Sequence, residues 1–462
     1  MRMLLTLFIA LQAANAAVAT QTDEACGRPD RPNIVLLFVD DLGWSDLGYR
    51  NPVLESPNID RLAQEGLDFE QAYIPCPTCS PSRAALLTGK HPVRLQMVRH
   101  IPVGPKHADF DAFGRTESEF NLWKTDPARF PCRNWLPLEQ TTYAEVLGEL
   151  GYHNEFLGKW HLGHEPYHPV QQGFDRQTGT SNFGHPRSYY PPYFRNATVF
   201  ADASRQYLTD RLTDEAVRFL KQYDRDQPFM LSLWYYNVHG PHQGREDLVT
   251  RFRQKGLTGK QAHYAAMVKS VDESVGRIRQ VLAEQKLAEN TVIVFLSDQG
   301  GYFENPPFRG GKRVDTLCEG GARVPFLVYW PGITEQGGKN RSIVQSTDLF
   351  PTLVEIAGGD PAAHDHLDGI SLLPTIRGNT LLDRGRPIFG YRAYEDLYAS
   401  VRSGKWKLLA YRSGKVALYD LSEDIAEAHD LSAEYPEKTS EMIDKLASWE
   451  REMGVAEYSG VQ

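Results

Sequence analysis

The sequence predicts an α/β fold, with a doubly wound, mostly parallel sheet flanked by helices and a small C-terminal α+β subdomain. Two continuous apolar runs, Asn33–Val39 and residues 290–296, are typical of strands buried on both faces of a parallel sheet. Near the C-terminus the pattern changes to short alternating strands followed by a helix over Pro436–Met453. We therefore expect a main domain over residues 20–386 and an antiparallel sheet with one helix over residues 387–462.

Composition and charge limit the classes of function. The chain has 462 residues, 41% hydrophobic and 24% charged, which suits a globular protein with one large and one small domain. The net charge of −9 provides no basic excess to neutralise nucleic-acid phosphates, so nucleic acid is not an expected partner. A pocket for an anionic ligand would have to be a local feature.

Residues 1–19 have the pattern of a signal peptide. Arg2 provides a positive start, residues 4–11 an apolar stretch, and Ala17-Val18-Ala19 a cleavage site. The apolar stretch is too short for a membrane anchor, and Gln12 interrupts its end. We expect an exported protein without a stable membrane anchor, periplasmic or secreted, or lysosomal or extracellular in a eukaryote.

Carboxylates follow both of the apolar runs. Asp40 and Asp41 end the first run, and Asp298 with Gln299 follows the second. Ligands of open α/β sheets bind at the carboxyl ends of the strands, so both endings can converge on one crevice. A divalent cation with oxygen ligands would offset the cost of gathering these charges. A solvated turn is the alternative for an Asp-Asp pair alone.

The stretch Cys79-Ser80-Pro81-Ser82-Arg83, followed by an apolar run, is the most informative part of the chain. Pro81 suits the first turn of a helix, which places Cys79 at or just before the helix N-terminus. Arg83 lies one turn further and can fold back towards Cys79. This arrangement suits an anionic substrate. A buried structural thiol and a Cys76-x-x-Cys79 redox pair are the alternatives, and spacing alone does not choose between the three.

Two later segments carry basic or histidine side chains. Lys159 and His161 follow a strand-like stretch, in a position that favours a site over ordinary surface charge. The buried strand over residues 229–236 leads to His239 and His242. Helical spacing predicts further helices over residues 142–150, 208–223, 261–287 and 348–357, and another buried strand covers residues 326–330.

The run from Cys79 to Gly89, Cys-x-Pro-Ser-Arg followed by Ala-x-Leu-x-Thr-Gly, resembles the signature of type I sulfatases in the alkaline-phosphatase-like superfamily. Gly158-Lys159-Trp160-His161 resembles a second signature of that family, and the resemblance extends from about Arg31 to the C-terminus. It implies hydrolysis of sulfate monoesters. It also implies that a formylglycine-generating enzyme oxidises Cys79 to formylglycine, whose hydrated aldehyde is the nucleophile.

The resemblance further implies one Ca²⁺ ion per chain. Its ligands would be Asp40, Asp41, Asp298, Gln299 and the formylglycine at Cys79. Gln299 departs from the family pattern, in which Asn or His is usual, but its amide oxygen can still bind the ion.

The remaining catalytic positions also follow from the resemblance. Arg83 and Lys159 would balance the charge of the sulfate, and His161 would accept a proton from the diol. His239, which stands two places before a proline, would serve the leaving group, and His242 is a weaker candidate that lines the pocket. Lys312 resembles the lysine that binds the sulfate ester, although it precedes Glu-Gly-Gly by about two residues more than expected, and Arg313 could substitute for it.

The cysteines and the chemistry leave some alternatives open. With Cys79 converted, two disulfides or four buried free thiols are both possible among Cys26, Cys76, Cys132 and Cys318. A broad arylsulfatase, a phosphonate or phosphodiester hydrolase of the same superfamily, and a glycan-binding pseudoenzyme remain alternatives to a carbohydrate sulfatase.

Two loops suggest how a substrate would be chosen. Residues 99–135 and 185–200 carry basic residues among aromatic ones, which suits stacking on sugar rings and pairing with anionic groups. We expect Arg115, Trp123 and Tyr190 to contact a sulfated poly- or oligosaccharide, while ordinary surface loops are the alternative. Changing these residues should weaken glycan turnover and spare a small aryl sulfate.

Overall fold

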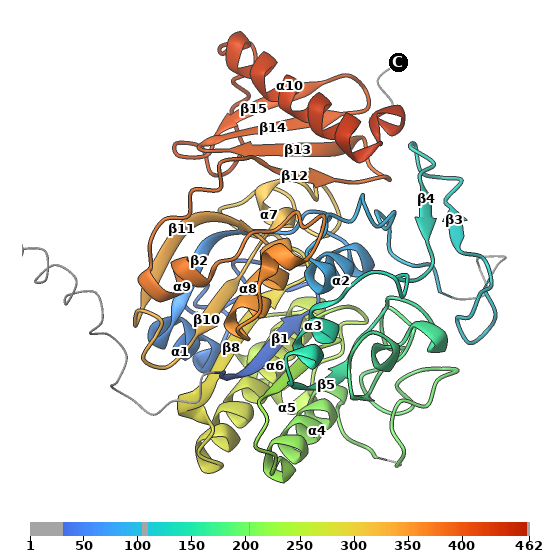
Figure 1. Cartoon of the computed structure of the whole chain (residues 1–462), viewed down its shortest axis with the longest axis vertical. Helices are drawn as coiled ribbons and strands as arrows, with labels where there is room; N and C mark the ends of the chain where they lie inside the picture. The colour runs from blue at the N-terminus through green and yellow to red at the C-terminus, as the bar shows by residue number, and fades with distance from the viewer. Residues whose placement is uncertain (1–30, 104–109, 203, 460–462) are drawn as a thin grey trace, which may run out of the picture. The chain divides into compact units, whose positions relative to one another are not determined.

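A central sheet of nine strands organises the molecule (Figure 1). The computed structural model describes residues 31–103, 110–202 and 204–459, so the predicted signal peptide and Cys26 lie outside the described residues. The strand order is β11-β2-β10-β8-β1-β7-β5-β6, with β9 paired to β2. The strands are β11 (Gly338–Gln345), β2 (Leu67–Tyr73), β10 (Phe326–Tyr329), β8 (Thr291–Ser297), β1 (Asn33–Val39), β7 (Phe229–Trp234), β5 (His153–Gly158), β6 (Arg176–Thr178) and β9 (Arg323–Val324).

Strand β1 lies at the centre, parallel to β7 on one side and to β8 on the other. Strands β5 and β6 extend the parallel part beyond β7, whereas β10 runs antiparallel to both β8 and β2. The prediction of a mostly parallel sheet flanked by helices is confirmed. All seven residues of β1 are buried, as expected for a strand covered on both faces.

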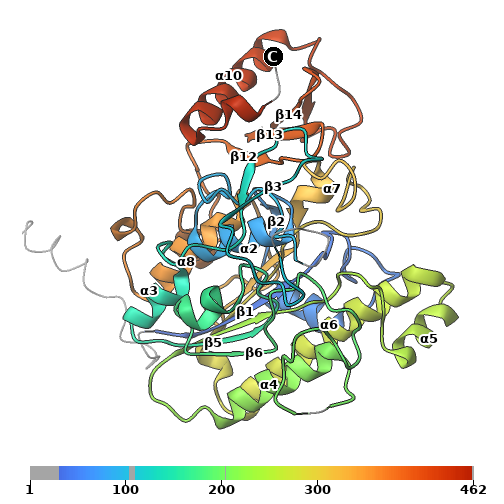
Figure 2. The same ribbon diagram turned by 90° about the vertical axis from the view of Figure 1, so that its right-hand side faces the viewer.

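The two faces of β1 contribute to two separate hydrophobic cores. Ile34, Leu36 and Phe38 pack in the core that includes residues of α2 (Cys79–Thr88), α3 (Tyr143–Glu149) and α8 (Leu349–Ile356). The alternate residues of β1 pack in the core beneath α4 and α6. Figure 2 shows helices on both sides of the sheet. The helices of the second face are α1 (Pro57–Glu65), α4 (Leu208–Gln222) and α6 (Gly259–Glu284), with α5 (Glu246–Gln254) packed on α6.

Helix positions agree with the sequence predictions apart from their ends. The helix expected over 208–223 is α4, and the one expected over 261–287 starts and ends slightly earlier, as α6. The helix expected over 348–357 is α8, which a 3₁₀ turn precedes. Four helices were not predicted: α1, α5, and the shorter α7 (Glu319–Ala322) and α9 (Leu373–Gly378).

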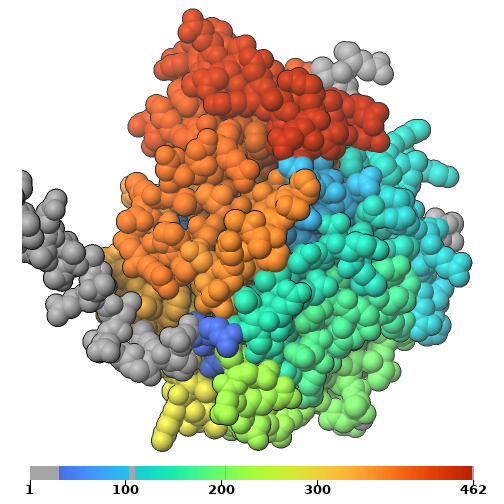
Figure 3. Space-filling view, viewed as in Figure 1, coloured from blue at the N-terminus to red at the C-terminus, as the bar shows by residue number. Residues whose placement is uncertain are grey.

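The C-terminal segment folds as an antiparallel sheet with one helix, as predicted. Its strands are consecutive neighbours, and α10 (Pro436–Met453) packs on them through Met442, Leu446 and Trp449. In the space-filling view this segment lies against the orange and light-blue parts of the chain (Figure 3). The four strands are β12 (Ile388–Tyr391), β13 (Leu397–Ser403), β14 (Trp406–Tyr411) and β15 (Val416–Asp420), and a separate small hairpin joins β3 (Phe120–Leu122) to β4 (Pro131–Arg133).

The C-terminal segment makes polar contacts with the segment that precedes α2. The backbone amide of Tyr391 donates to the Pro75 carbonyl at 3.0 Å. The Arg392 guanidinium donates to the Pro77 carbonyl. The Tyr394 and Thr78 hydroxyls lie 2.8 Å apart. These bonds fix the backbone that leads into α2.

Of the two alternatives left open for the cysteines, the described residues fit buried free thiols. Cys76, Cys132 and Cys318 are free and buried in apolar clusters, so two disulfides do not form. Across the described part of the chain, none of the helices is both long and apolar enough to cross a membrane.

Candidate active site

The predicted site residues come together where several elements end at one edge of the central sheet. Asp40 and Asp41 follow β1, and Asp298 with Gln299 follows β8. Lys159 follows β5, and α2 begins at Cys79. Parallel strands carry their carboxyl ends to the same edge, which explains why residues so far apart in the sequence meet here.

Three carboxylates form the floor of the site. Oxygen atoms of Asp40, Asp41 and Asp298 lie within 4.8 Å of one another, and all three side chains are buried. The backbone amide of Asp41 donates to Asp298 Oδ1 at 3.0 Å, which fixes the relative position of the two strand ends. Burial raises the pKa of Asp298 to about 7, and the neighbouring Asp40 charge adds to the shift. Additional positive charge would therefore stabilise this cluster.

Three cations surround the carboxylates. Arg83 lies 3.1 Å from Asp298 Oδ2 and 3.7 Å from Asp40 Oδ1. Lys159 pairs with Asp40, and Lys312 pairs with Asp41. The Arg83 guanidinium is directed to the carboxylates and to the Lys159 carbonyl, to which it donates at 2.8 Å, rather than to Cys79 itself. Each carboxyl group thus has a cationic neighbour, which reduces the cost of burying the three aspartates together.

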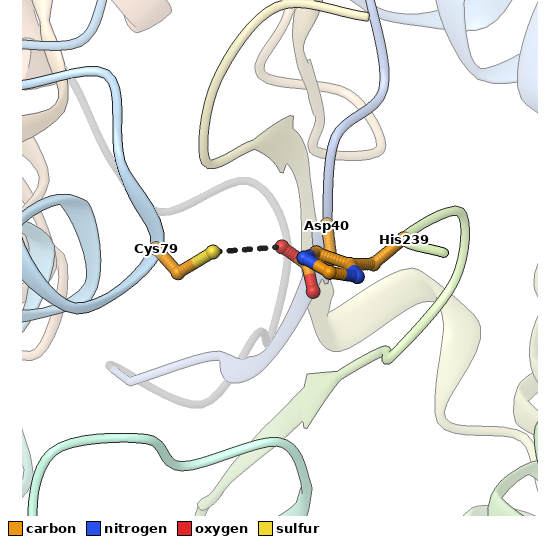
Figure 4. Close-up of side chains that lie close together, drawn as sticks. All are labelled: Asp40, Cys79 and His239. Atoms are coloured by element: carbon orange, nitrogen blue, oxygen red, sulfur yellow. Dashed lines mark hydrogen bonds between the residues drawn. The ribbon is translucent and has the colours of Figure 1, made fainter. Parts of the chain in front are cut away.

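Cys79 is the residue at the centre of this arrangement. Its Sγ lies 3.7 Å from Asp40 Oδ1 and 3.7 Å from Gln299 Nε2. Figure 4 shows the sulfur and the His239 ring approaching Asp40 from different segments. Burial raises the pKa of the Cys79 thiol to about 12, so an unmodified thiol is a poor nucleophile here. The redox-pair alternative fails, because Cys76 is free and its Sγ contacts the Val98 carbonyl instead.

His161 is held as a neutral imidazole. Its Nε2 lies 3.0 Å from the Ile101 carbonyl, which can only accept, so Nε2 carries the hydrogen. Nδ1 is buried without a hydrogen-bond partner and is therefore an available proton acceptor. Burial, together with the Lys159 charge, lowers the pKa of His161 well below its usual value. A Cβ on Gly184 would lie 2.4 Å from the His161 ring, so this glycine leaves room for the imidazole.

Strain accompanies two of these residues. Asp41 and His161 both have left-handed backbone conformations, with φ of 63° and 56°. Such conformations cost a non-glycine residue on the order of 1 kcal/mol and concentrate at functional sites. The fold thus holds both side chains in place at an energetic cost.

His239 lies in the segment that follows β7 and approaches the carboxylates from there. Its Nδ1 donates to the Gly240 carbonyl at 2.7 Å, and its Nε2 lies 3.8 Å from Asp41 Oδ2. The ring stacks on His185, with 5.2 Å between centroids. His242 lies instead against the rings of Tyr302 and Tyr264.

Two connected cavities open onto these groups. The inner cavity, of about 380 Å³, is lined by Cys79, His161 and Gln299 among others. The outer cleft, of about 650 Å³, is lined by residues of the 185–200 loop and by Tyr302. His185, His239 and Lys312 line both, so the two spaces are continuous.

Comparison with known proteins identifies the chain. A family profile described as Sulfatase matches residues 32–359, and one described as N-sulphoglucosamine sulphohydrolase, C-terminal, matches residues 312–452. The chain belongs to the sulfatase family. The N-acetylgalactosamine-6-sulfatase of Homo sapiens is 35% identical over 396 residues, covering 80% of this chain and 70% of that protein. The steryl-sulfatase of Mus musculus is 30% identical over 482 residues, covering 84% and 72%.

Solved structures agree with this assignment to the sulfatases. The structure titled Ps i-CgsB in complex with k-i-k-neocarrahexaose has a TM-score of 0.78 and 30% identity, with 94% of each chain covered. The structure of BT4656 with D-Glucosamine-2-N, 6-O-disulfate has a TM-score of 0.68 at 20% identity, covering 94% of this chain and 100% of that chain. At that identity the likeness supports the fold alone.

The candidate residues outside the sulfatase core occupy varied positions. Arg313 lies at the cleft, with its guanidinium 5.3 Å from the Tyr302 ring. Arg115 is exposed and paired with Glu165. Tyr190 packs edge-on to Tyr207. The Trp123 ring contacts the Arg99 guanidinium and the His100 ring. Trp123 would therefore act on a substrate by positioning these two side chains.

Sequence reasoning missed Tyr394, which lines the inner cavity. It comes from the C-terminal subdomain, and its ring lies between the guanidinium groups of Arg99 and Arg392, with their centres 3.7 and 4.0 Å from the ring centroid. No local pattern marks this tyrosine, because only tertiary folding brings it beside Thr78.

Proposed function

We propose that this sulfatase hydrolyses sulfate monoesters of a sulfated oligo- or polysaccharide, using a formylglycine made from Cys79 and one Ca²⁺ ion. The observation that carries the proposal is the position of Cys79. It stands at the N-terminus of α2, on a floor of three carboxylates and three cations, at the base of an open cavity. A formylglycine-generating enzyme would be its partner during maturation, and the pattern of residues 1–19 supports export.

The residues present fit a calcium ion. Three buried carboxylates supply hard oxygen donors, which is the chemistry Ca²⁺ prefers. Gln299 Nε2 donates to Asp41 Oδ1 at 2.6 Å, so the side-chain amide lies at the cluster, and rotation of this amide would present its oxygen to the ion. Asp40, Asp41, Asp298, Gln299 and the modified residue 79 would hold the ion. When bound, it would supply positive charge to the sulfate oxygens and lower the pKa of the hydrated aldehyde.

The cations of this chain bind and orient the sulfate group. Lys159 and Lys312 place ammonium groups at Asp40 and Asp41, next to Cys79, where a sulfate oxygen can accept their hydrogen bonds. Arg83 has no exposed surface and is tied to Asp298, so it holds the carboxylates and adds fixed positive charge to the site. This preorganised charge is suited to a reaction in which negative charge moves from the ester oxygen to sulfate.

The two histidines provide proton transfer at opposite sides. The unpartnered Nδ1 of His161 can accept the proton released at residue 79. His239 Nε2 faces the junction of the two cavities, where the leaving alcohol would sit, and it can deliver a proton there once substrate charge favours its protonated form. Lys312 is the alternative donor. Each such role contributes on the order of 10²–10⁴-fold.

The substrate class is supported by the relatives and by the cleft. The names of two relatives specify sulfated or carrageenan-derived sugars, and the outer cleft has the dimensions and aromatic walls for a saccharide. The phosphonate or phosphodiester hydrolase remains the rival, since the same floor of charges would accept a phosphoryl group.

Co-expression with a formylglycine-generating enzyme tests the proposal. The peptide containing Cys79 should lose the thiol mass and gain an aldehyde, and the protein should then hydrolyse 4-nitrophenyl sulfate in a calcium-dependent manner. Full turnover by protein with an unmodified Cys79 would contradict it, and faster hydrolysis of 4-nitrophenyl phosphate would favour the rival. Screening defined sulfated oligosaccharides, including N-acetylgalactosamine 6-sulfate glycans and carrageenan fragments, would identify the sugar.

A further inference from the structure

The outer cleft contains two arginines that differ from the other cations near the site. Arg187 and Arg195 both line the cleft, and both are exposed. Within residues 31–103, 110–202 and 204–459, neither guanidinium forms an ion pair with a carboxylate. By contrast, Arg83, Lys159 and Lys312 are each paired to an aspartate. The uncompensated positive charge of the continuous cavity therefore lies in its outer part.

The shape of the cleft relates these arginines to the reacting atoms. Lys312 and His239 line both cavities, so a sulfate ester that reaches Cys79 leads its alcohol portion into the outer cleft. Phe183, Phe194 and Tyr302 provide apolar walls beside the arginines. An aromatic wall with a guanidinium next to it suits a sugar ring that carries an anionic substituent.

We propose that Arg187 and Arg195 form a subsite for a second anionic group on the leaving saccharide, so that the preferred substrate carries at least two negative charges. This inference rests on the proposed function. A guanidinium can donate two parallel hydrogen bonds to a sulfate or a carboxylate. The second group is therefore either another sulfate ester or a uronate carboxylate. In a protein of net charge −9, such local cations are required to attract a multiply charged substrate.

Competitive kinetics provide the test. The reporter is 4-methylumbelliferyl sulfate, whose small leaving group carries no second anionic group for Arg187 or Arg195 to bind. The competitors are chondroitin disaccharides with one sulfate, with two sulfates, and with one sulfate and a methyl-esterified uronate. The wild type should bind the doubly sulfated disaccharide at least about tenfold more tightly than the esterified one, because a charged hydrogen-bonded pair contributes about 1.4 kcal/mol or more. If the esterified disaccharide binds more weakly than the monosulfated disaccharide with a free uronate, the arginines bind the uronate carboxylate. If only the added sulfate strengthens binding, they bind a second sulfate.

The variants Arg187→Ala and Arg195→Ala should each reduce the preference for the doubly sulfated over the esterified disaccharide about tenfold. They should also reduce the salt dependence of this preference and leave reporter turnover unchanged. Arg187→Lys and Arg195→Lys should keep part of it. Arg218→Ala removes an exposed arginine from α4 and serves as the matched control. Equal inhibition constants for all disaccharides, or variants that keep the wild-type preference, would overturn the subsite. Absence of any turnover of the reporter would instead contradict the proposed function.

Discussion

The inner cavity and the outer cleft share three residues but treat charge in opposite ways. In the inner cavity, each cation next to Cys79 is paired with a buried carboxylate. In the outer cleft, Arg187 and Arg195 are exposed and have no carboxylate partner among the described residues. Under the proposed function, the inner groups would bind the part common to all sulfate esters. The outer groups meet the part that varies between substrates.

Removing a carboxylate from the floor should have the largest effect. Asp298→Ala should abolish calcium binding and lower kcat/KM on 4-nitrophenyl sulfate by about 10³-fold or more, because the charge balance around residue 79 is lost. It should also destabilise the fold by about 3 kcal/mol, since Arg83 stays buried with one partner fewer. Metal content by mass spectrometry and urea unfolding measure the two effects separately.

The control for this change is Asp247→Ala, which removes an exposed aspartate of α5. Asp298→Asn keeps the size of the side chain and isolates the effect of charge. An Asp298→Ala protein that bound calcium and turned over normally would show that the metal site lies elsewhere.

The next largest effect should come from disturbing His161. Lys159→Ala and His161→Ala should each lower turnover of aryl and glycan substrates together, by about 10²-fold or more. Gly184→Ala should act in the same direction through position alone, because the new methyl group would meet the His161 ring. Gly378→Ala, whose methyl group would meet nothing closer than 3.4 Å, is the matched control. If turnover fell on the glycan alone, His161 would contribute to recognition of the saccharide rather than to the reaction common to all sulfate esters.

A smaller effect should come from the C-terminal subdomain. Tyr394→Phe removes the hydroxyl that lies 2.8 Å from Thr78 and should lower kcat several-fold, as expected for one neutral hydrogen bond worth about 1 kcal/mol. KM should stay unchanged if Tyr394 positions the nucleophile. The exposed Tyr435→Phe is the control. A change confined to KM for the glycan would instead make Tyr394 a contact of the leaving group.

The smallest effect should be that of Gln299→Asn. The shorter side chain retains an amide oxygen, so calcium binding and kcat/KM should stay within about threefold of the wild type, equivalent to less than 1 kcal/mol. Titration with calcium after treatment with a chelator measures this. A loss comparable to that of Asp298→Ala would show that the length of the glutamine side chain is essential to the cluster.

Much of the fold followed from local sequence, because the buried strands are continuous apolar runs. Strands β1, β7 and β8 could be predicted in this way. Strand β2 was not predicted, because Asp68, Glu70 and Gln71 interrupt its apolar pattern; Asp68 is nevertheless buried, paired with Arg50 at 2.7 Å. That ion pair forms only in the folded protein, so no local rule would reveal it.

The site residues likewise divide into those that local sequence predicts and those that only the folded structure reveals. Residues at strand ends and in the Cys79 segment could be predicted, because turns after buried strands are natural places for ligands. Which side chains of the 185–200 loop face the cleft could not, since Tyr190 packs on Tyr207 while Arg187 and Arg195 line the cavity. Loop conformation depends on contacts with residues far away in the sequence. Composition alone therefore indicates which loop lies near the substrate, but not which of its side chains face the cleft.

The bonds from Arg392 and Tyr394 to the segment before Cys79 have a consequence for heat inactivation. The backbone that presents residue 79 is held partly by the small sheet β12–β15 rather than by the central sheet alone. If the small sheet loosens first on warming, turnover will fall while most of the molecule is still folded. Inactivation would then precede the main unfolding transition, and the lifetime of the enzyme at a given temperature would depend on its smaller part.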